Sequence, residues 1–281
     1  MADDRLKVDD VAQAFEAKDV NFLGEGTFGE TWKVSGISVD QVLGDYAVKI
    51  LRPHVFDARL LEREVQGLAR IRSRGVVRLH EVREVGIAGG TRTCLICELI
   101  PGGDVTHNSK KSAPDPASVT KFGCGLLKSI AGLHAADVIH RDIKSDNIIL
   151  REGDWADPVL IDFGLSKGIG DQTHTVYPAR VGTYTYMSPE QLRGERARKA
   201  SDLWACGVIL YQLLAGRHPY FSNFTGLQVE DLADLTDGPP PALPATTPSA
   251  LEDLVVRLLS QDAYKRGSAA RAASDLGKMI S

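Results

Sequence analysis

Two short motifs carry the side chains that could do chemistry. The run His140–Asn147 places an aspartate (Asp142), a lysine (Lys144) and an asparagine (Asn147) within one loop. The triplet Asp162-Phe163-Gly164 follows after a short apolar segment and adds a second carboxylate. These groups are what a site needs to hold a polyphosphate on a divalent metal while a hydroxyl group attacks it. An unrelated polar surface loop would rarely be followed by the matching triplet, so the two motifs together indicate phosphoryl transfer.

A glycine-rich motif lies near the N-terminus, at Gly24-Glu25-Gly26-Thr27-Phe28-Gly29. On its own G-x-G-x-x-G is ambiguous, because dinucleotide-binding folds also use it. In those folds a helix follows, whereas here Thr31-Trp32-Lys33-Val34 has the β-branched character of a strand, and a further strand carries Ala47-Val48-Lys49. A glycine-rich hairpin lets backbone amides approach phosphates closely, and Lys49 would add a point charge.

A lysine on a strand is poorly placed unless another group holds it. Residues 57–72 are expected to form a helix, because apolar residues recur there at helical spacing. Glu64 on this helix is the expected partner of Lys49, and Glu62 is the alternative.

The first third of the chain is strand-rich, and the chain becomes mostly helical after Pro101-Gly102-Gly103. The expected strands and helices are strands at 20–34, 45–51, 76–85 and 93–100 with a turn at Gly44-Asp45, a helix beginning at Asp115-Pro116, a helix at 201–215, and a last helical region with a capping box at Ser249–Glu252.

Composition excludes several functional classes. The net charge is -4, which argues against a dedicated nucleic-acid binder, whose footprint is usually basic. The N-terminal residues lack the apolar core of a signal peptide, and the longest apolar stretch, around 203–214, is too short to cross a bilayer. We therefore expect a cytoplasmic protein with no membrane segment in this chain.

The four cysteines do not suggest a metal site. Cys94 and Cys97 form a C-x-x-C, but no second pair or adjacent histidine completes a zinc set. The pair lies in a predicted strand, where residues three apart point to opposite faces. Packing cysteines in a reducing compartment are the better interpretation.

Taken together, the motifs resemble those of the eukaryotic-type serine/threonine protein kinase catalytic domain, which bacteria also contain. The resemblance runs from about residue 20 to the C-terminal helix. It implies an α+β, two-lobed fold with a small β-rich N-lobe that contains one key helix and a larger α-helical C-lobe. Residues 1–281 would then be one kinase domain, with the N-lobe in 1–100, the hinge near 97–103 and the C-lobe in 104–281. The motifs follow the family's order: the glycine motif, Ala47-Val48-Lys49, Glu64, the hinge, His140–Asn147, Asp162-Phe163-Gly164, Ser188-Pro189-Glu190, Asp202-Leu203-Trp204 and Arg266.

The resemblance implies a role for each residue of the catalytic motifs. Asp142 would accept or orient the proton of the attacking hydroxyl, and Lys144 would offset charge on the transferred phosphoryl group. Asn147 and Asp162 would supply the hard oxygen ligands that Mg²⁺, or Mn²⁺, prefers. Arg141 is expected to bind a phosphate in the activation loop rather than to take part in catalysis.

The resemblance also implies an ATP site. The backbones of Glu98 and Ile100 would bond the adenine edge, Asp104 would bond the ribose, and Leu23, Ala47 and Ile149 would line the apolar adenine slot. The residues expected to bind ATP are Leu23, Gly24, Glu25, Gly26, Thr27, Phe28, Gly29, Thr31, Ala47, Lys49, Glu64, Glu98, Ile100, Asp104 and Ile149.

Two structural roles follow from the same comparison. His140 is expected to pack beneath the Asp162 turn rather than to act as a general base. Glu190 and Arg266, far apart in the sequence, match the family's buried ion pair.

The type of residue that receives the phosphate can be narrowed. Lys144, two residues after Asp142, is the serine/threonine pattern, and residues 182–190 look like the family's substrate-docking segment, in which Thr183 would bridge Asp142 and Lys144. A phosphate on Thr173 or Thr175 would pair with Arg141 and order the loop, although loop threonines are often merely solvated.

The sequence thus predicts an ATP-dependent kinase that phosphorylates serine or threonine in protein substrates and is activated by autophosphorylation, with dimerisation as one route to phosphorylation in trans. The alternatives are a pseudokinase scaffold, which the filled catalytic positions disfavour, and a small-molecule kinase, which residues 182–190 disfavour.

Overall fold

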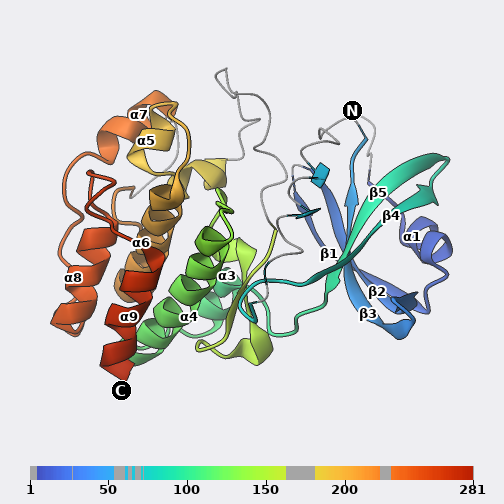
Figure 1. The fold of residues 1–281 in the computed structure, drawn as a ribbon, viewed down its shortest axis with the longest axis horizontal. Coiled ribbons are helices and arrows are strands. Elements are labelled where there is room, and N and C mark those ends of the chain that lie inside the picture. The colour runs from blue at the N-terminus through green and yellow to red at the C-terminus, as the bar shows by residue number, and fades with distance from the viewer. Residues whose placement is uncertain are drawn as a thin grey trace. The chain divides into compact units, whose positions relative to one another are not determined.

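The computed structural model of the chain describes residues 5–26, 28–53, 61–62, 65–66, 71, 73–162, 181–221 and 229–280. These residues belong to two compact units, drawn in Figure 1. Unit 1 is built from residues within Met1–Arg70 and Val77–Ile100, and unit 2 from residues within Ile71–Val76, Pro101–Gly164 and Gly170–Ser281. Unit 1 is the sheet-rich part and unit 2 the helical part, so the expected α+β fold class is confirmed.

Unit 1 is built around one antiparallel sheet with the strand order β1-β2-β3-β5-β4. Its strands alternate between buried and more exposed positions, the period of two that a pleated sheet imposes. The sheet strands are β1 (Asp19–Gly26), β2 (Gly29–Val39), β3 (Val42–Leu51), β4 (Leu79–Ile87) and β5 (Gly90–Glu98).

The two faces of this sheet belong to two separate apolar clusters. Val48 and Ile50 of β3 belong to the larger cluster, whereas Leu51 belongs to the smaller one. Cys94 and Cys97 of β5 divide between the clusters in the same way, so their side chains cannot bind one metal ion together. Burial raises the pKa of the Cys94 thiol to about 12, which agrees with a packing role.

A short helix, α1 (Val8–Phe15), covers the larger cluster. Its buried residues are Val11 and Phe15, one turn apart, and it contacts β1, β2 and β4. This helix was not predicted from the sequence and is a finding of the structure.

The connection between β2 and β3 differs from the prediction. Asp40 and Gln41 form the turn, with φ of 49° and 67°. Positive φ at both residues suits a tight hairpin, because its twist matches that of the strands. The prediction of a turn at Gly44-Asp45 was wrong. Both residues lie within β3, where the Asp45 carboxylate is 3.4 Å from Lys33 Nζ of β2.

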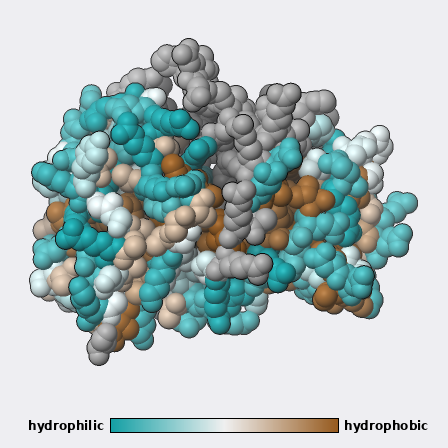
Figure 2. Space-filling view, in the orientation of Figure 1, coloured by the Kyte–Doolittle hydropathy of each residue, from teal (hydrophilic) through white to brown (hydrophobic). Residues whose placement is uncertain are grey.

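Unit 2 contains a helical core and a small two-stranded hairpin, and hydrophilic side chains predominate on the face of it shown in Figure 2. Its elements are α3 (Val105–Lys111), α4 (Pro116–Ala135), η1 (Ser145–Asn147), β6 (Ile148–Leu150), η2 (Arg151–Gly153), β7 (Pro158–Leu160), η3 (Val181–Tyr186), α5 (Pro189–Leu192), α6 (Lys199–Ala215), α7 (Val229–Leu235), α8 (Ser249–Leu258) and α9 (Ala269–Ile280).

Helices α4 and α6 form the centre of unit 2. As predicted, α4 begins at Asp115-Pro116, where the Asp115 carboxylate accepts from the Ser118 N–H at 2.7 Å and caps the helix. The predicted helix at 201–215 is α6, which begins two residues earlier and is buried along most of its length. Helix α9 lies against α4, where the Leu276 side chain meets Gly123 closely.

Two other helix predictions have different outcomes. The capping box at Ser249–Glu252 was wrong. Pro248 is the last extended residue before α8, so Ser249 is already inside the helix and its hydroxyl does not cap it. Of the helix predicted at 57–72, residues 61–62 and 65–66 are helical, and most of the remainder lies outside the described residues.

No helix in the described part of the chain combines the length and the apolar composition needed to cross a membrane.

Candidate active site

The catalytic-loop residues predicted from the sequence converge on one carboxylate. Lys144 Nζ donates to Asp142 Oδ2 at 3.0 Å, and Asn147 Nδ2 donates to the same oxygen at 3.0 Å. The Asn147 amide also donates to the backbone carbonyl of Asp142 at 2.9 Å. The lysine and the amide therefore fix the orientation of the Asp142 carboxylate, and they keep a positive charge beside it.

The loop backbone is anchored by a buried aspartate in the first turn of α6. Asp202 is 1% exposed, and its two carboxylate oxygens accept from the N–H groups of His140 (3.0 Å) and Arg141 (2.9 Å). His134 Nε2 lies 2.8 Å from Asp202 Oδ2. Asp202 belongs to a motif of the sequence for which no role was predicted. The available signal was a lone carboxylate at the start of a strongly apolar helix.

His140 is buried next to Ile161, the residue before Asp162. Its Nδ1 accepts from the Asp142 N–H at 3.4 Å, so its Nε2 carries the proton and donates to the Ile161 carbonyl at 3.1 Å. Burial lowers the pKa of His140 despite the nearby carboxylates, which favours the neutral ring. The ring is buried and bonded to the residue before Asp162, which agrees with the structural role expected of it.

The hairpin of β6 and β7 brings the two predicted metal ligands to one end. Ile148 pairs with Leu160, and the Ile161 N–H donates to the Asn147 carbonyl at 3.0 Å. Asn147 therefore directly precedes one strand, and Asp162 follows two residues after the other. An amide oxygen and a carboxylate at one end of a hairpin are the hard donors that suit Mg²⁺.

Two residues of the site have left-handed backbones. Arg141 has φ of 66° and Asp162 has φ of 58°. This conformation costs an L-residue roughly 1–3 kcal/mol, and it persists when the surroundings fix it. For Arg141, the N–H bond to Asp202 supplies one such constraint.

The predicted ribose-binding residue already has a structural task. Asp104 is the N-cap of α3, and its Oδ1 accepts from the His107 N–H at 2.6 Å. Its backbone forms a bridge with Ile149, which was predicted to line the adenine slot. The structure thus places these two residues side by side in unit 2.

In unit 1, Ala47 and Lys49 lie on the face of the sheet that carries the smaller cluster. Ala47 is opposite Cys97 of β5, and Lys49 lies between Thr31 of β2 and Leu95 of β5. Cys97 and Leu95 belong to that cluster. The predicted phosphate-binding lysine and the predicted adenine-facing alanine therefore share one surface.

The glycine motif forms the end of the β1–β2 hairpin, where Gly26 pairs with Gly29. A Cβ on Gly29 would lie 2.0 Å from the Ile50 carbonyl oxygen, so no larger residue fits there. Arg52 donates to the Gly26 carbonyl at 2.8 Å and forms an ion pair with Glu25. A Cβ on Gly24 or Gly26 would meet no described residue within 4 Å, as approach of a ligand would require.

At the predicted hinge, the Glu98 N–H donates to the Arg78 carbonyl at 2.9 Å. This bond uses the donor of Glu98, so an adenine contact at this residue would use the carbonyl as acceptor.

Some predicted site residues cannot be placed. Thr27, Glu64, Phe163, Gly164, Thr173, Thr175 and the side chain of Thr183 lie outside the described residues.

The segment 184–190 contacts the catalytic loop and the helical core. Tyr186 donates through its hydroxyl to Ser145 Oγ at 3.2 Å. Glu190 forms the predicted ion pair with Arg266, which is fully buried and donates at 2.7 and 2.9 Å to its two oxygens. Burial would raise the pKa of Glu190, but the hydrogen bonds and charge of Arg266 outweigh it, and the pKa is lowered.

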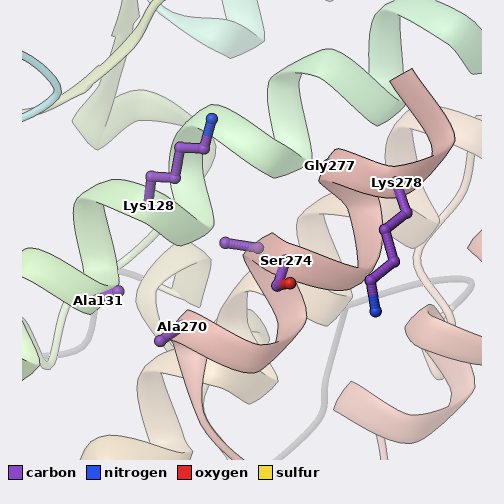
Figure 3. Close-up of a pocket in the computed structure, with 7 residues that line it drawn as sticks. Lys128, Ala131, Ala270, Ser274, Gly277 and Lys278 are labelled. Carbon is purple, nitrogen blue, oxygen red and sulfur yellow. The ribbon is translucent and has the colours of Figure 1, made fainter. Parts of the chain in front are cut away.

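A shallow groove between α4 and α9 lies apart from these residues (Figure 3). Its volume is about 490 Å³, and Lys128 and Lys278 lie on its two sides. No predicted site residue that the structure describes lines it.

Comparison with known proteins agrees with this geometry. Residues 17–275 match the protein kinase domain family. The chain is 32% identical over 261 residues to calcium/calmodulin-dependent protein kinase type II subunit delta of Oryctolagus cuniculus, covering 89% of this chain and 46% of that protein. It is 31% identical over 279 residues to serine/threonine-protein kinase pkn3 of Myxococcus xanthus, covering 92% of this chain and 49% of that protein. The chain therefore spans about half the length of these relatives. With the catalytic loop, the sheet and the Glu190–Arg266 pair in place, the chain belongs to the protein kinase domain family.

Proposed function

We propose that the chain is an ATP-dependent serine/threonine kinase that phosphorylates protein substrates. The observation that carries this proposal is the Asp142 carboxylate, held at one oxygen by both Lys144 and Asn147. A carboxylate fixed in this way can orient a substrate hydroxyl and accept its proton as the oxygen attacks the γ-phosphorus and the bond to the ADP oxygen breaks. Lys144, already beside Asp142, would offset the charge that develops on the phosphoryl group.

The nucleotide would be bound by the residues that the sequence predicts for it. The glycine hairpin and Lys49 would contact the phosphates, and Asp104 and Ile149 would contact the nucleoside. Asn147 and Asp162 would hold Mg²⁺, or Mn²⁺, which neutralises phosphate charge when bound.

The serine/threonine assignment is supported by Lys144 and by the similarity to a relative named as a serine/threonine-protein kinase. The contact between Tyr186 and Ser145 supports a protein substrate over a small molecule, because it ties segment 184–190 to the catalytic loop.

The test is transfer of labelled γ-phosphate to the chain itself and to generic proteins, by wild type and by Asp142→Asn. We expect incorporation to fall by about 1,000-fold or more in Asp142→Asn while ATP binding is retained. Asp146→Asn is the matched control, because Asp146 is an exposed carboxylate of the same loop. A wild-type protein that binds ATP but phosphorylates neither itself nor any protein would support the scaffold alternative.

We also propose activation by phosphate on Thr173 or Thr175, sensed by Arg141, and transfer between two copies as its route. Phosphate should be found on one of these threonines by mass spectrometry, and autophosphorylation should accelerate with protein concentration. Full activity of the Thr173→Ala/Thr175→Ala protein would contradict this proposal.

A further inference from the structure

His218 is a buried histidine just beyond α6 that no step of the proposed reaction uses. It is 8% exposed, and its Nδ1 accepts from the N–H groups of Tyr220 and Phe221, both at 3.1 Å. Because Nδ1 is an acceptor, the neutral ring carries its proton on Nε2. Nε2 then donates to the Thr185 carbonyl at 2.9 Å.

The surroundings keep this ring in place and neutral. It stacks on Phe221 with ring centroids 4.6 Å apart. Burial lowers the pKa of His218 to about 4, although the bond to Thr185 works against the shift. At neutral pH the ring is therefore a fixed neutral donor that points at one backbone carbonyl.

That carbonyl belongs to the segment expected to meet the protein substrate. Thr185 lies between Tyr184, which packs in a cluster with Met187 and Phe221, and Tyr186, whose hydroxyl bonds to Ser145 of the catalytic loop. The segment is thus held at neighbouring residues from two directions. The Tyr186 side chain ties it to the loop, and His218 ties its backbone to the corner after α6.

We propose that His218 is a positioning residue that sets the backbone of segment 184–190 against the catalytic loop and so controls affinity for the protein substrate. This inference rests on the proposed function. A shift of this backbone would change the affinity for a peptide bound at the segment. It would not change the affinity for ATP, which is expected to bind at other residues.

Two conservative variants separate the two hydrogen-bonding ends of the ring. His218→Asn keeps an acceptor close to the main chain for the Tyr220 and Phe221 N–H groups, but it is too short to reach Thr185. His218→Gln places an amide N–H near the position of Nε2 and can still donate to the Thr185 carbonyl. Tyr220→Phe is the control: its hydroxyl has no hydrogen-bond partner among the described residues, and its ring stacks on Trp204 in the same corner.

The experiment measures the KM for a serine peptide, the KM for ATP and kcat, with thermal stability recorded for each variant. Loss of one hydrogen bond should raise the peptide KM of His218→Asn by about 3- to 10-fold and leave the ATP KM within about 2-fold. His218→Gln and Tyr220→Phe should stay within about 2-fold of wild type for both substrates. A lowered melting temperature with an unchanged peptide KM in His218→Asn would overturn the inference and leave a purely structural role.

Hydrogen exchange at residues 184–192 supplies a second readout that needs no turnover. His218→Asn should exchange faster there than wild type, and His218→Gln should not. Equal exchange in all three would also overturn the inference. If wild type transfers no phosphate at all, the proposed function fails, whereas the exchange result still decides whether His218 fixes the segment. If His218→Asn does not fold, a peptide KM raised by more than about 3-fold in His218→Gln decides against the inference.

Discussion

The catalytic loop of unit 2 and the glycine hairpin of unit 1 are each tied by one buried carboxylate, in different ways. Asp202 accepts directly from two backbone N–H groups of the catalytic loop. Glu30, which follows the last glycine of the hairpin and is 4% exposed, accepts from the Trp32 indole and from the Leu6 N–H, both at 3.1 Å. One carboxylate fixes the loop's own backbone, and the other fixes the hairpin through neighbours.

The two carboxylates link their segments to different parts of the fold. The loop is held by a residue of the central helix α6, so its geometry is set within unit 2. The hairpin is linked through Glu30 to Leu6, which precedes residue 17, where the family match begins. We infer that the proposed catalytic loop is held from within the matched range, whereas the proposed phosphate-binding hairpin is held in part by a residue outside it.

The strongest test of the comparison is Asp202→Ala. It leaves the N–H groups of His140 and Arg141 without their acceptor, and each unsatisfied buried donor costs about 1–3 kcal/mol. We expect the free energy of unfolding to fall by about 4 kcal/mol and kcat to fall by more than about 100-fold. Denaturant unfolding and steady-state kinetics measure both. Asp202→Asn keeps one acceptor oxygen, so its stability and kcat should lie between those of wild type and Asp202→Ala. A kcat of Asp202→Ala within about tenfold of wild type would show that the loop needs no such anchor.

Phe15→Ala tests the corresponding dependence of unit 1 on α1. Removing this buried ring should lower the free energy of unfolding by about 3 kcal/mol, because a cavity opens against the larger cluster of the sheet. Hydrogen exchange should increase in β1 and β2 and remain unchanged in α4 and α6. Val8→Ala is the matched control, since Val8 is on the same helix but 52% exposed. Exchange that rises equally in both units would mean that α1 does not act on unit 1 alone.

Acid should weaken unit 2 through its buried histidines. The folded pKa of His218, about 4, is below its usual 6.5, so the unfolded state binds more protons as the pH falls below 6.5. The free energy of unfolding therefore keeps its full value above about pH 6.5. It falls progressively towards pH 4, by up to about 3 kcal/mol. The pKa of His140 is lowered as well, so it contributes in the same direction. Melting temperatures between pH 7.5 and pH 4.5 measure the loss. In His218→Gln the loss should be clearly smaller, and an equal loss would assign the acid sensitivity to other groups.

Glu30→Gln should have the smallest effect. It preserves the side-chain size but replaces one acceptor oxygen with a donor, so either the Leu6 or the Trp32 hydrogen bond is lost at a cost of about 1 kcal/mol. We expect the KM for ATP to rise about 3-fold with kcat little changed, together with a change in Trp32 fluorescence. A fall in kcat with an unchanged ATP KM would mean that Glu30 does not affect nucleotide binding by the hairpin.

The parts of the fold that follow from local pattern could be predicted from the sequence. The apolar stripe of α4, its Asp115 cap and the strong apolar run of α6 were all found in this way. The Glu190–Arg266 pair was also found, but only because the order of motifs matched a known family. Spacing alone does not bring residues 76 positions apart together.

Predictions failed or were missing where a distant part of the chain decides the local structure. The two-turn helix α1 is too short to be stable alone and is held by contacts with the sheet. The turn at Asp40-Gln41 contains no glycine, so the glycine at position 44 attracted the prediction instead. The roles of Asp202 and His218 depend on backbone groups more than 30 residues away, which no sequence pattern displays.

The left-handed backbones of Arg141 and Asp162 have a consequence for how this sequence tolerates variation. Glycine adopts a positive φ without the steric cost that other residues meet, so the fold should accept glycine more readily than any other replacement at these two positions. The same replacement removes the guanidinium proposed to sense a phosphate and the carboxylate proposed to hold a metal ion. In a survey of all single substitutions, protein abundance and catalytic activity should therefore rank glycine oppositely at Arg141 and Asp162, which marks both side chains as retained for function against the preference of the backbone.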